Sequence, residues 1–199
     1  MRIVRCLLVL GLLLPAGPLL ADAIEGRVSD ISDGATVSVI DKAKNQHTVR
    51  LVAIDVPESR QAFGKASKRN LSALTLGKEV RVEWSSRDRY GRIVGKLVVG
   101  SPACATCAKT RDAGLAQLEA GLAWWDRAQR REQSLEDQGY YEYAEFDART
   151  RRIGLWSEAA PIPPWEWRRK HQTVARRDGP PQSVTPRNSG ALPAPAGAS

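Results

Sequence analysis

Two neighbouring segments place an arginine and two carboxylates where they could act on a phosphate. Arg50 lies in the run 47–54, whose alternation predicts a strand with Arg50 on the face opposite Val49 and Leu51. Asp55 and Glu58 follow, three residues apart, where the predicted strand gives way to a helix. A guanidinium can donate paired hydrogen bonds to phosphate oxygens, and a carboxylate can act as a general base or bind a hard cation.

A third segment, Asp88-Arg89-Tyr90-Gly91-Arg92, predicts a tight turn rich in basic groups. Taken one at a time, these residues also have structural explanations. Arg50 could be a surface strand residue, Glu58 a charge that favours a helix N-terminus, and Arg92 a charge that protects an edge strand. Only their combination points to a site.

The elements that must position these residues are short strands and a few helices. Period-two patterns predict five strands, at 28–31, 36–40, 47–54, 80–84 and 93–99. Helical spacing predicts three helices: one after Pro57 that stops at Gly77, one after Asp112, and one from Ser134 to Gly154. The expected fold is therefore α+β and mainly β, a five-stranded OB-type Greek-key barrel with three helices.

The two ends of the chain differ from this domain. Residues 1–23 combine Arg2 and Arg5 with an apolar run and an Ala21-Asp22-Ala23 site, which predicts a cleaved signal peptide and a periplasmic or secreted protein with no membrane anchor after cleavage. The folded domain is expected at 24–169. Residues 170–199, rich in Pro, Ala, Gly and Ser, are expected to form a disordered tail.

The amino-acid composition excludes several classes of protein. With 42% hydrophobic and 26% charged residues and no sustained repeat, the chain is not a coiled coil, a collagen or a polytopic membrane protein. A net charge of +8 agrees with a polyanionic partner such as nucleic acid. Cys104 and Cys107 remain after signal cleavage and are expected to form a local disulfide in an oxidising compartment, with a zinc or redox site as the alternatives.

Several motifs in order resemble the staphylococcal nuclease (thermonuclease) family from about Ile24 to Trp156. They are Asp33-Gly34-x-Thr36, Val49-Arg50-Leu51, Ile54-Asp55-x-Pro57-Glu58, Asp88-x-Tyr90-Gly91-Arg92, Gly121-Leu122-Ala123 and Gly154-Leu155-Trp156. The following Pro164-Trp165-Glu166-Trp167-Arg168 is similar to an ending of secreted bacterial members. We expected Trp156, Trp165 and Trp167 to pack this segment onto the domain, and the basic residues from Arg168 onward to form a solvated tail or an arm that holds phosphate.

The resemblance implies a role for each matching residue. Arg50 and Arg92 would be the catalytic arginines and Glu58 the general base. Asp55 and the backbone carbonyl of Val56 would bind a divalent metal, usually Ca²⁺, with Asp33 beside it. Arg89 and Tyr90 would hold a phosphate of the nucleotide.

Two positions depart from the family pattern. Ala35 stands where the family has a second aspartate as a metal ligand, so a weakened calcium site, or another divalent ion, is expected. Trp124 and Trp125 precede the positions where relatives place tyrosines, and either tryptophan could stack a base or belong to the core. Of the two, Trp125 is predicted to bind the substrate.

These features favour a secreted, monomeric, metal-assisted nuclease, with endonuclease action and reduced activity both expected. The alternative is a nucleic-acid-binding module that has lost most of its turnover, since Ala35 removes a ligand.

Overall fold

A computed structural model describes residues 22–100 and 109–177 of the chain. These two ranges contain eight strands, of which six form one sheet and two form a small separate ribbon. They are β1 (Asp22–Ile31), β2 (Thr36–Asp41), β3 (Gln46–Leu51), β4 (Ile54–Asp55), β5 (Glu79–Arg87), β6 (Ile93–Gly100), β7 (Lys109–Asp112) and β8 (Trp124–Trp125).

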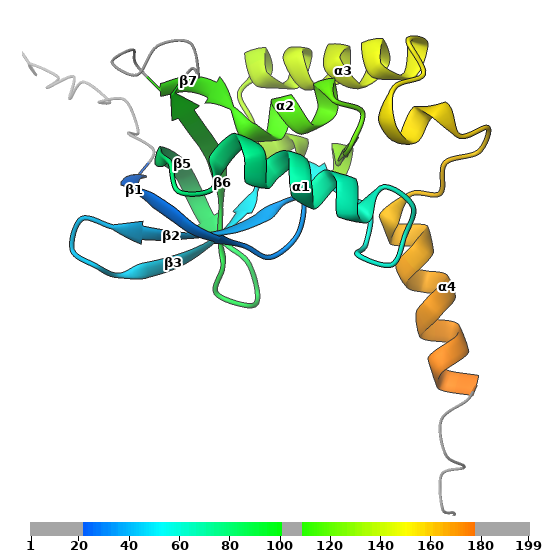
Figure 1. Cartoon of the computed structure of the whole chain (residues 1–199), viewed down its shortest axis with the longest axis horizontal. Coiled ribbons are helices and arrows are strands. Elements are labelled where there is room, and N and C mark those ends of the chain that lie inside the picture. Colours follow the sequence, from blue (N-terminus) through cyan, green and yellow to red (C-terminus); the bar gives the residue numbers. More distant parts are fainter. Residues whose placement is uncertain (1–21, 101–108, 178–199) are drawn as a thin grey trace, which may run out of the picture.

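The large sheet closes on itself. Its strand order is β3-β2-β1-β5-β6-β7, and β3 also pairs with β6, which joins five strands into a barrel (Figure 1). The neighbours pair antiparallel except at this closing seam, where β3 and β6 run parallel with Val49 opposite Ile93 and Arg50 opposite Val94. The expected five-stranded barrel is confirmed, and β7 adds an outer strand to β6.

Alternation along the strands sends one set of side chains into the barrel. The interior is filled by aliphatic residues, nearly all β-branched, that are at most 2% exposed: Val28, Val37, Val39, Val49, Leu51, Val80, Val82, Ile93, Leu97 and Val99. Burial of this set gives the barrel its stability and leaves the opposite faces of the same strands for polar groups.

In the described part of the chain, four α-helices lie outside the barrel, one more than expected: α1 (Gly64–Thr75), α2 (Ala113–Glu119), α3 (Leu135–Thr150) and α4 (Pro164–Arg177). Two of them begin at the predicted caps. The Asp112 carboxylate accepts hydrogen bonds from the N–H groups of Gly114 and Leu115, and the Ser134 hydroxyl accepts one from Asp137. Short 3₁₀ helices cover Arg127–Glu132 and Gly154–Ser157.

The end predicted for the third strand, at residue 54, is wrong. The strand stops at Leu51, the chain turns through Ala53 at φ +53°, and Ile54–Asp55 become β4, which pairs with β8. The first predicted helix also begins later than expected, at Gly64. Residues 57–63 are therefore a loop, and this loop carries Glu58.

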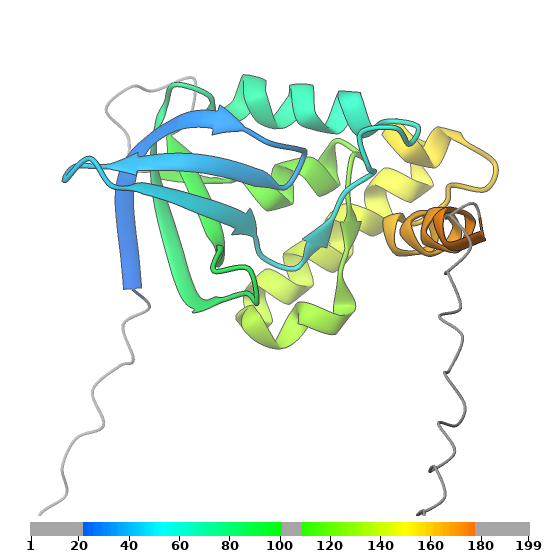
Figure 2. The same cartoon turned by 90° about the horizontal axis from the view of Figure 1, so that it is seen from below.

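Two elements of the structure cross the expected domain boundaries. Asp22 and Ala23 already pair with Trp84 and Glu83 at the start of β1. The boundary expected at 169/170 falls inside α4, which continues to Arg177 and extends away from the barrel (Figure 1). Figure 2 shows the same helix nearly end-on.

Three of the expectations concern residues outside the described ones: the signal peptide up to residue 21, the tail beyond 177, and the Cys104–Cys107 disulfide. Within the described ranges, no helix is both long and apolar enough to cross a bilayer.

Candidate active site

Arg50 and Asp55 are brought together by the turn between β3 and β4. The register sets Arg50 opposite Thr36 of β2, so the two side chains share one face of the barrel wall. Arg50 Nη2 donates to the Ile54 carbonyl at 3.4 Å and lies 3.7 Å from Asp55 Oδ1. The Asp55 side chain is only 6% exposed, so this arginine offsets a largely buried negative charge.

Glu58 is positioned by the loop that follows β4. Gln61 closes a short turn here: its N–H donates to the Glu58 carbonyl at 2.8 Å, and its side-chain oxygen accepts from the Glu58 N–H at 3.1 Å. The Gln61 amide also donates to the carbonyl of Ile162, which ties the loop to the segment before α4. The Glu58 side chain is 40% exposed and is therefore accessible to water.

A third arginine, which the sequence analysis had not assigned to the site, joins these carboxylates. Arg168 of α4 donates from Nη2 to Asp55 Oδ2 at 2.6 Å, and from Nη1 to Asp55 Oδ1 at 3.3 Å and to Glu58 Oε1 at 2.8 Å. These two carboxylates raise the pKa of the guanidinium further above its ordinary value, Asp55 being the larger cause. Arg168 is thus a permanent cation between the two acidic groups.

Arg92 lies on the β5–β6 turn and has no hydrogen bond to either carboxylate. Its Nε donates to Asp88 Oδ2 at 2.7 Å, and Asp88 also accepts from the N–H groups of Tyr90 and Arg92. These donors lower the pKa of Asp88, although its burial opposes the shift. The Tyr90 ring is 67% exposed, with the guanidinium of Arg89 at 4.8 Å and that of Arg92 at 5.4 Å from its centroid.

The barrel seam nevertheless sets Arg92 close to Arg50 along the sheet. Arg92 directly precedes Ile93, which pairs with Val49, and Arg50 pairs with Val94. Two arginines far apart in sequence therefore lie at the same seam, Arg50 on β3 and Arg92 in the turn directly before β6. Arg89 and Tyr90, predicted to hold a phosphate, form the exposed tip of the same hairpin.

The predicted metal site fits a divalent ion poorly. Ala35 is fully buried and has no side-chain oxygen, and one oxygen of Asp33 accepts a hydrogen bond from the Ala35 N–H at 2.7 Å. Val56, expected to offer its carbonyl, follows Asp55 directly and is buried. The Thr36 hydroxyl is buried without a hydrogen-bond partner and adds one neutral oxygen.

Charged ligands are the missing part of that donor set. Calcium prefers about 6–8 oxygens, with affinity set by how many are charged. Both oxygens of Asp55 and one of Glu58 are already bonded to Arg168. In the part of the chain that the structure describes, no three His, Cys, Asp or Glu side chains gather as a metal-binding group.

The two tryptophans of β8 are both in the core. Trp124 packs edge-on against Trp156, with 5.4 Å between ring centroids, as one of the two expectations had it. Trp125 is 5% exposed, its indole N–H donates to Gln133 at 3.0 Å, and the Arg127 guanidinium lies 4.5 Å from its ring centroid. In this conformation Trp125 presents no free face to a base, because packing against the barrel end covers it.

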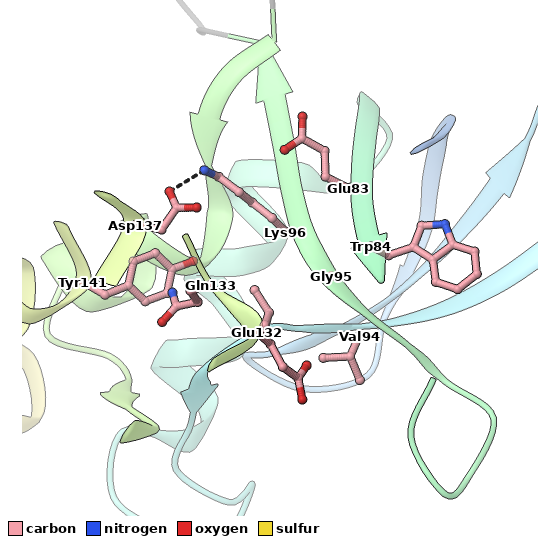
Figure 3. Close-up of a pocket in the computed structure, with 10 residues that line it drawn as sticks. Glu83, Trp84, Val94, Gly95, Lys96, Glu132, Gln133, Asp137 and Tyr141 are labelled. Atoms are coloured by element: carbon pink, nitrogen blue, oxygen red, sulfur yellow. Dashed lines mark hydrogen bonds and ion pairs between the residues drawn. The ribbon is translucent and has the colours of Figure 1, made fainter. Parts of the chain in front are cut away.

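A pocket elsewhere in the molecule contains other ionisable groups. It has a volume of about 200 Å³ and lies between β5, β6 and α3, where Lys96 and Asp137 form a 2.6 Å ion pair (Figure 3). None of Arg50, Asp55, Glu58 or Arg92 lines it. Burial raises the pKa of the nearby Asp112 carboxyl, partly offset by a hydrogen bond from Tyr141 and by the charge of Lys96. We assign this group to holding α2 and α3 on the barrel.

Comparison with known proteins shows which family this chain belongs to. Residues 48–158 match the model of the family described as staphylococcal nuclease homologue. The chain is 35% identical to Protein ParB of Escherichia coli over 174 residues, which cover 87% of this chain and 94% of that protein. It is 40% identical to a micrococcal nuclease of Shigella flexneri over 148 residues, 72% of this chain and 80% of that protein.

An uncharacterized endonuclease of Escherichia coli is 35% identical over 153 residues, 77% of this chain and 90% of its own length. The matched region contains the arginine of β3, the β4 carboxylate, Glu58 and the basic hairpin. The chain belongs to the staphylococcal nuclease homologue family.

Proposed function

We propose that this protein is a nuclease that hydrolyses phosphodiester bonds of DNA or RNA. The observation that carries the proposal is that Arg50, Asp55 and Glu58 gather beside the β3–β6 seam, with Arg92 in the turn directly before β6. Relatives named nuclease and endonuclease support the proposal. The name endonuclease favours cleavage at internal bonds of the nucleic acid. The basic tip formed by Arg89 and Tyr90 suits a nucleotide phosphate.

The reaction follows from what these groups can do. A water held by Glu58 would attack phosphorus and give one proton to that carboxylate while the P–O ester bond breaks, and the leaving oxygen would take a proton from a solvent water. Negative charge grows on the equatorial oxygens, so fixed guanidinium groups that meet those oxygens lower the barrier. Arg50 is held rigidly on a strand, and Arg92 would reach the phosphate from the hairpin by exchanging its Asp88 partner.

The first prediction is that Arg50→Ala, Arg92→Ala and Glu58→Gln each reduce turnover strongly. Loss of one transition-state donor costs roughly 100-fold or more, and loss of the base removes the proton acceptor. Cleavage of single-stranded and double-stranded DNA and of RNA by the purified protein would measure this. Arg81→Ala is the matched control, because this strand arginine pairs with Glu83 at 3.4 Å. If both arginine variants keep rates within a few-fold of wild type, neither arginine is catalytic.

Ala35 favours a second candidate, a nucleic-acid-binding protein with little turnover. Binding of an oligonucleotide by the wild type without any cleavage, with calcium, magnesium, manganese or chelator, would support that candidate. The expectation of a bound divalent metal stays a prediction, and the present donor set does not favour it.

We further propose that the protein acts as a monomer in the periplasm or outside the cell, after cleavage behind Ala23. The motive is the basic and apolar character of residues 1–23. Sequencing the N-terminus of the exported protein and measuring its mass by light scattering test both points. A mature chain that still begins at Met1, or a stable dimer, would contradict them.

A further inference from the structure

Arg168 makes more polar contacts with the site carboxylates than either arginine that the sequence predicted. Its two terminal nitrogens form three hydrogen bonds with Asp55 and Glu58, and Nη1 is shared between the two carboxylates. Arg50 approaches Asp55 only to 3.7 Å, and Arg92 is paired with Asp88. The guanidinium of Arg168 therefore holds two acidic side chains side by side.

The segment before α4 anchors this arginine. Pro164 is buried at the first position of the helix, and Trp165 packs edge-on against Trp124 with centroids 6.4 Å apart. The Ile162 carbonyl accepts from Gln61, the residue that also closes the Glu58 loop. Arg168 follows Trp165 by three residues, so one helical turn carries it from the tryptophan contact to the carboxylates. The pairing is part of how α4 docks.

Charge at the site is balanced without a metal. Asp55 and Glu58 carry two negative charges, and Arg50 and Arg168 carry two positive ones. A cation of higher charge would need the same carboxylate oxygens that Arg168 occupies. Ala35 removes the further carboxylate that could have held such an ion beside the arginine.

We propose that the Arg168 guanidinium takes the place of a divalent metal at this site. This inference rests on the proposed nuclease function. Arg168 keeps the Glu58 carboxylate beside Asp55 and places a fixed positive charge where a phosphate would approach. A guanidinium has five N–H donors, and three are used here. Its remaining N–H groups can donate to a phosphate oxygen.

The same geometry leaves Glu58 able to act as a base. Arg168 bonds Glu58 through Oε1, and the Glu58 side chain is 40% exposed. A water can therefore donate to Oε2 while Oε1 stays fixed. Arg168 and a calcium ion then become mutually exclusive occupants of one pair of carboxylates.

Calorimetric titration with calcium and cleavage assays in chelator together test this proposal. The set is wild type, Arg168→Ala, Arg168→Lys and Lys170→Ala, the last removing a neighbouring exposed cation of the same helix. We expect wild type and Lys170→Ala to cleave equally well with chelator or calcium. Arg168→Ala should bind calcium at least ~10-fold more tightly than wild type, because both carboxylates are released.

In chelator, Arg168→Ala should lose ~100-fold or more in cleavage rate. Arg168→Lys should keep part of the rate, and guanidinium chloride below denaturing concentrations should partly rescue Arg168→Ala. A merely structural contact would lower thermal stability without changing the metal dependence.

Three results would overturn the proposal. The first is a wild type that does not cleave in chelator and is activated by calcium, and the second is equal calcium affinity in wild type and Arg168→Ala. The third is faster cleavage by Arg168→Ala than by wild type in chelator, which would mean that the arginine inhibits the reaction. If no variant cleaves under any condition, the proposed function fails. The calcium titration then still decides whether arginine and metal compete.

Discussion

Asp55 is the residue on which the site depends most. Its side chain is 6% exposed, and a charge buried to this degree is costly unless it is paired and hydrogen-bonded. Arg168 supplies two bonds and Arg50 a nearby charge. Removing either partner leaves a buried carboxylate less compensated, whereas removing Asp55 leaves two arginines facing each other.

A double substitution at the residue scale should rebuild a metal site. Ala35→Asp adds a carboxylate close to the start of β2, and Arg168→Ala frees Asp55 and Glu58. We expect the double variant to bind calcium at least ~10-fold more tightly than Arg168→Ala alone, because affinity rises with the number of charged ligands. Its melting temperature should rise with calcium, since the ion binds only the folded form.

Ala35→Asp alone is the informative control. With Arg168 in place, the new carboxylate meets no vacant ion site, and in chelator the double variant should be less stable than Arg168→Ala because like charges face each other. Titration calorimetry and thermal melts of all four proteins measure both effects. Equal calcium affinities for the double variant and Arg168→Ala would mean that position 35 does not face the metal site.

At the scale of elements, local signals in the sequence predicted most of the barrel and the starts of α2 and α3. Asp112 and Ser134 cap their helices because their side chains satisfy free N–H groups, which is a local effect. The division of 47–54 into β3 and β4 could not be predicted, because Ala53 adopts positive φ only where the chain must turn to pair with β8.

The docking of α4 was missed for a similar reason. Its sequence is strongly polar, and its place depends on Trp165 against Trp124 and on Arg168 between two carboxylates. Trp165 packs onto the domain as expected, but Trp167 stacks on His171 of its own helix, 4.1 Å between centroids. The one signal that could have revealed Arg168 was its spacing of three residues from Trp165.

The turn between β2 and β3 gives a pH prediction at this scale. Asp41 accepts a hydrogen bond from His47 and bonds from Asn45, which together lower the pKa of Asp41 to about 2 from its ordinary 3.8. The folded state favours the ionised carboxyl, so this stabilisation is full above pH 3.8 and is lost as the pH falls towards 2. The free energy of unfolding should therefore fall over that range.

Asp41→Asn tests this, because asparagine can still accept from the Asn45 N–H but has no charge to lose. The variant should be less stable than wild type above pH 3.8, and its stability should change less between pH 3.8 and 2. Urea unfolding at a series of pH values measures it, with the exposed Asp30→Asn as control. Parallel pH profiles for wild type and Asp41→Asn would show that the turn does not contribute to acid sensitivity.

At the scale of the whole molecule, the parallel pairing of β3 with β6 has a consequence for the order of folding events. Hairpins such as β2–β3 and β5–β6 join segments that are close in sequence, whereas this seam must close a long loop first. Arg50 and Arg92 become neighbours only when it has formed. A refolding chain can therefore gain most of its strands before it has a site.

We expect cleavage activity to return with the slowest refolding phase, later than the far-ultraviolet circular dichroism signal. Dilution from urea, followed by dichroism and by cleavage of a fluorogenic oligonucleotide, compares the two. Addition of a prolyl isomerase separates seam closure from proline isomerisation, which is also slow. If cleavage activity returned together with the first change in dichroism, Arg50 and Arg92 would have to be in position before the β3–β6 seam closes, and this prediction would be wrong. The formation of the β3–β6 seam would therefore set the moment at which a refolding chain becomes able to cleave its substrate.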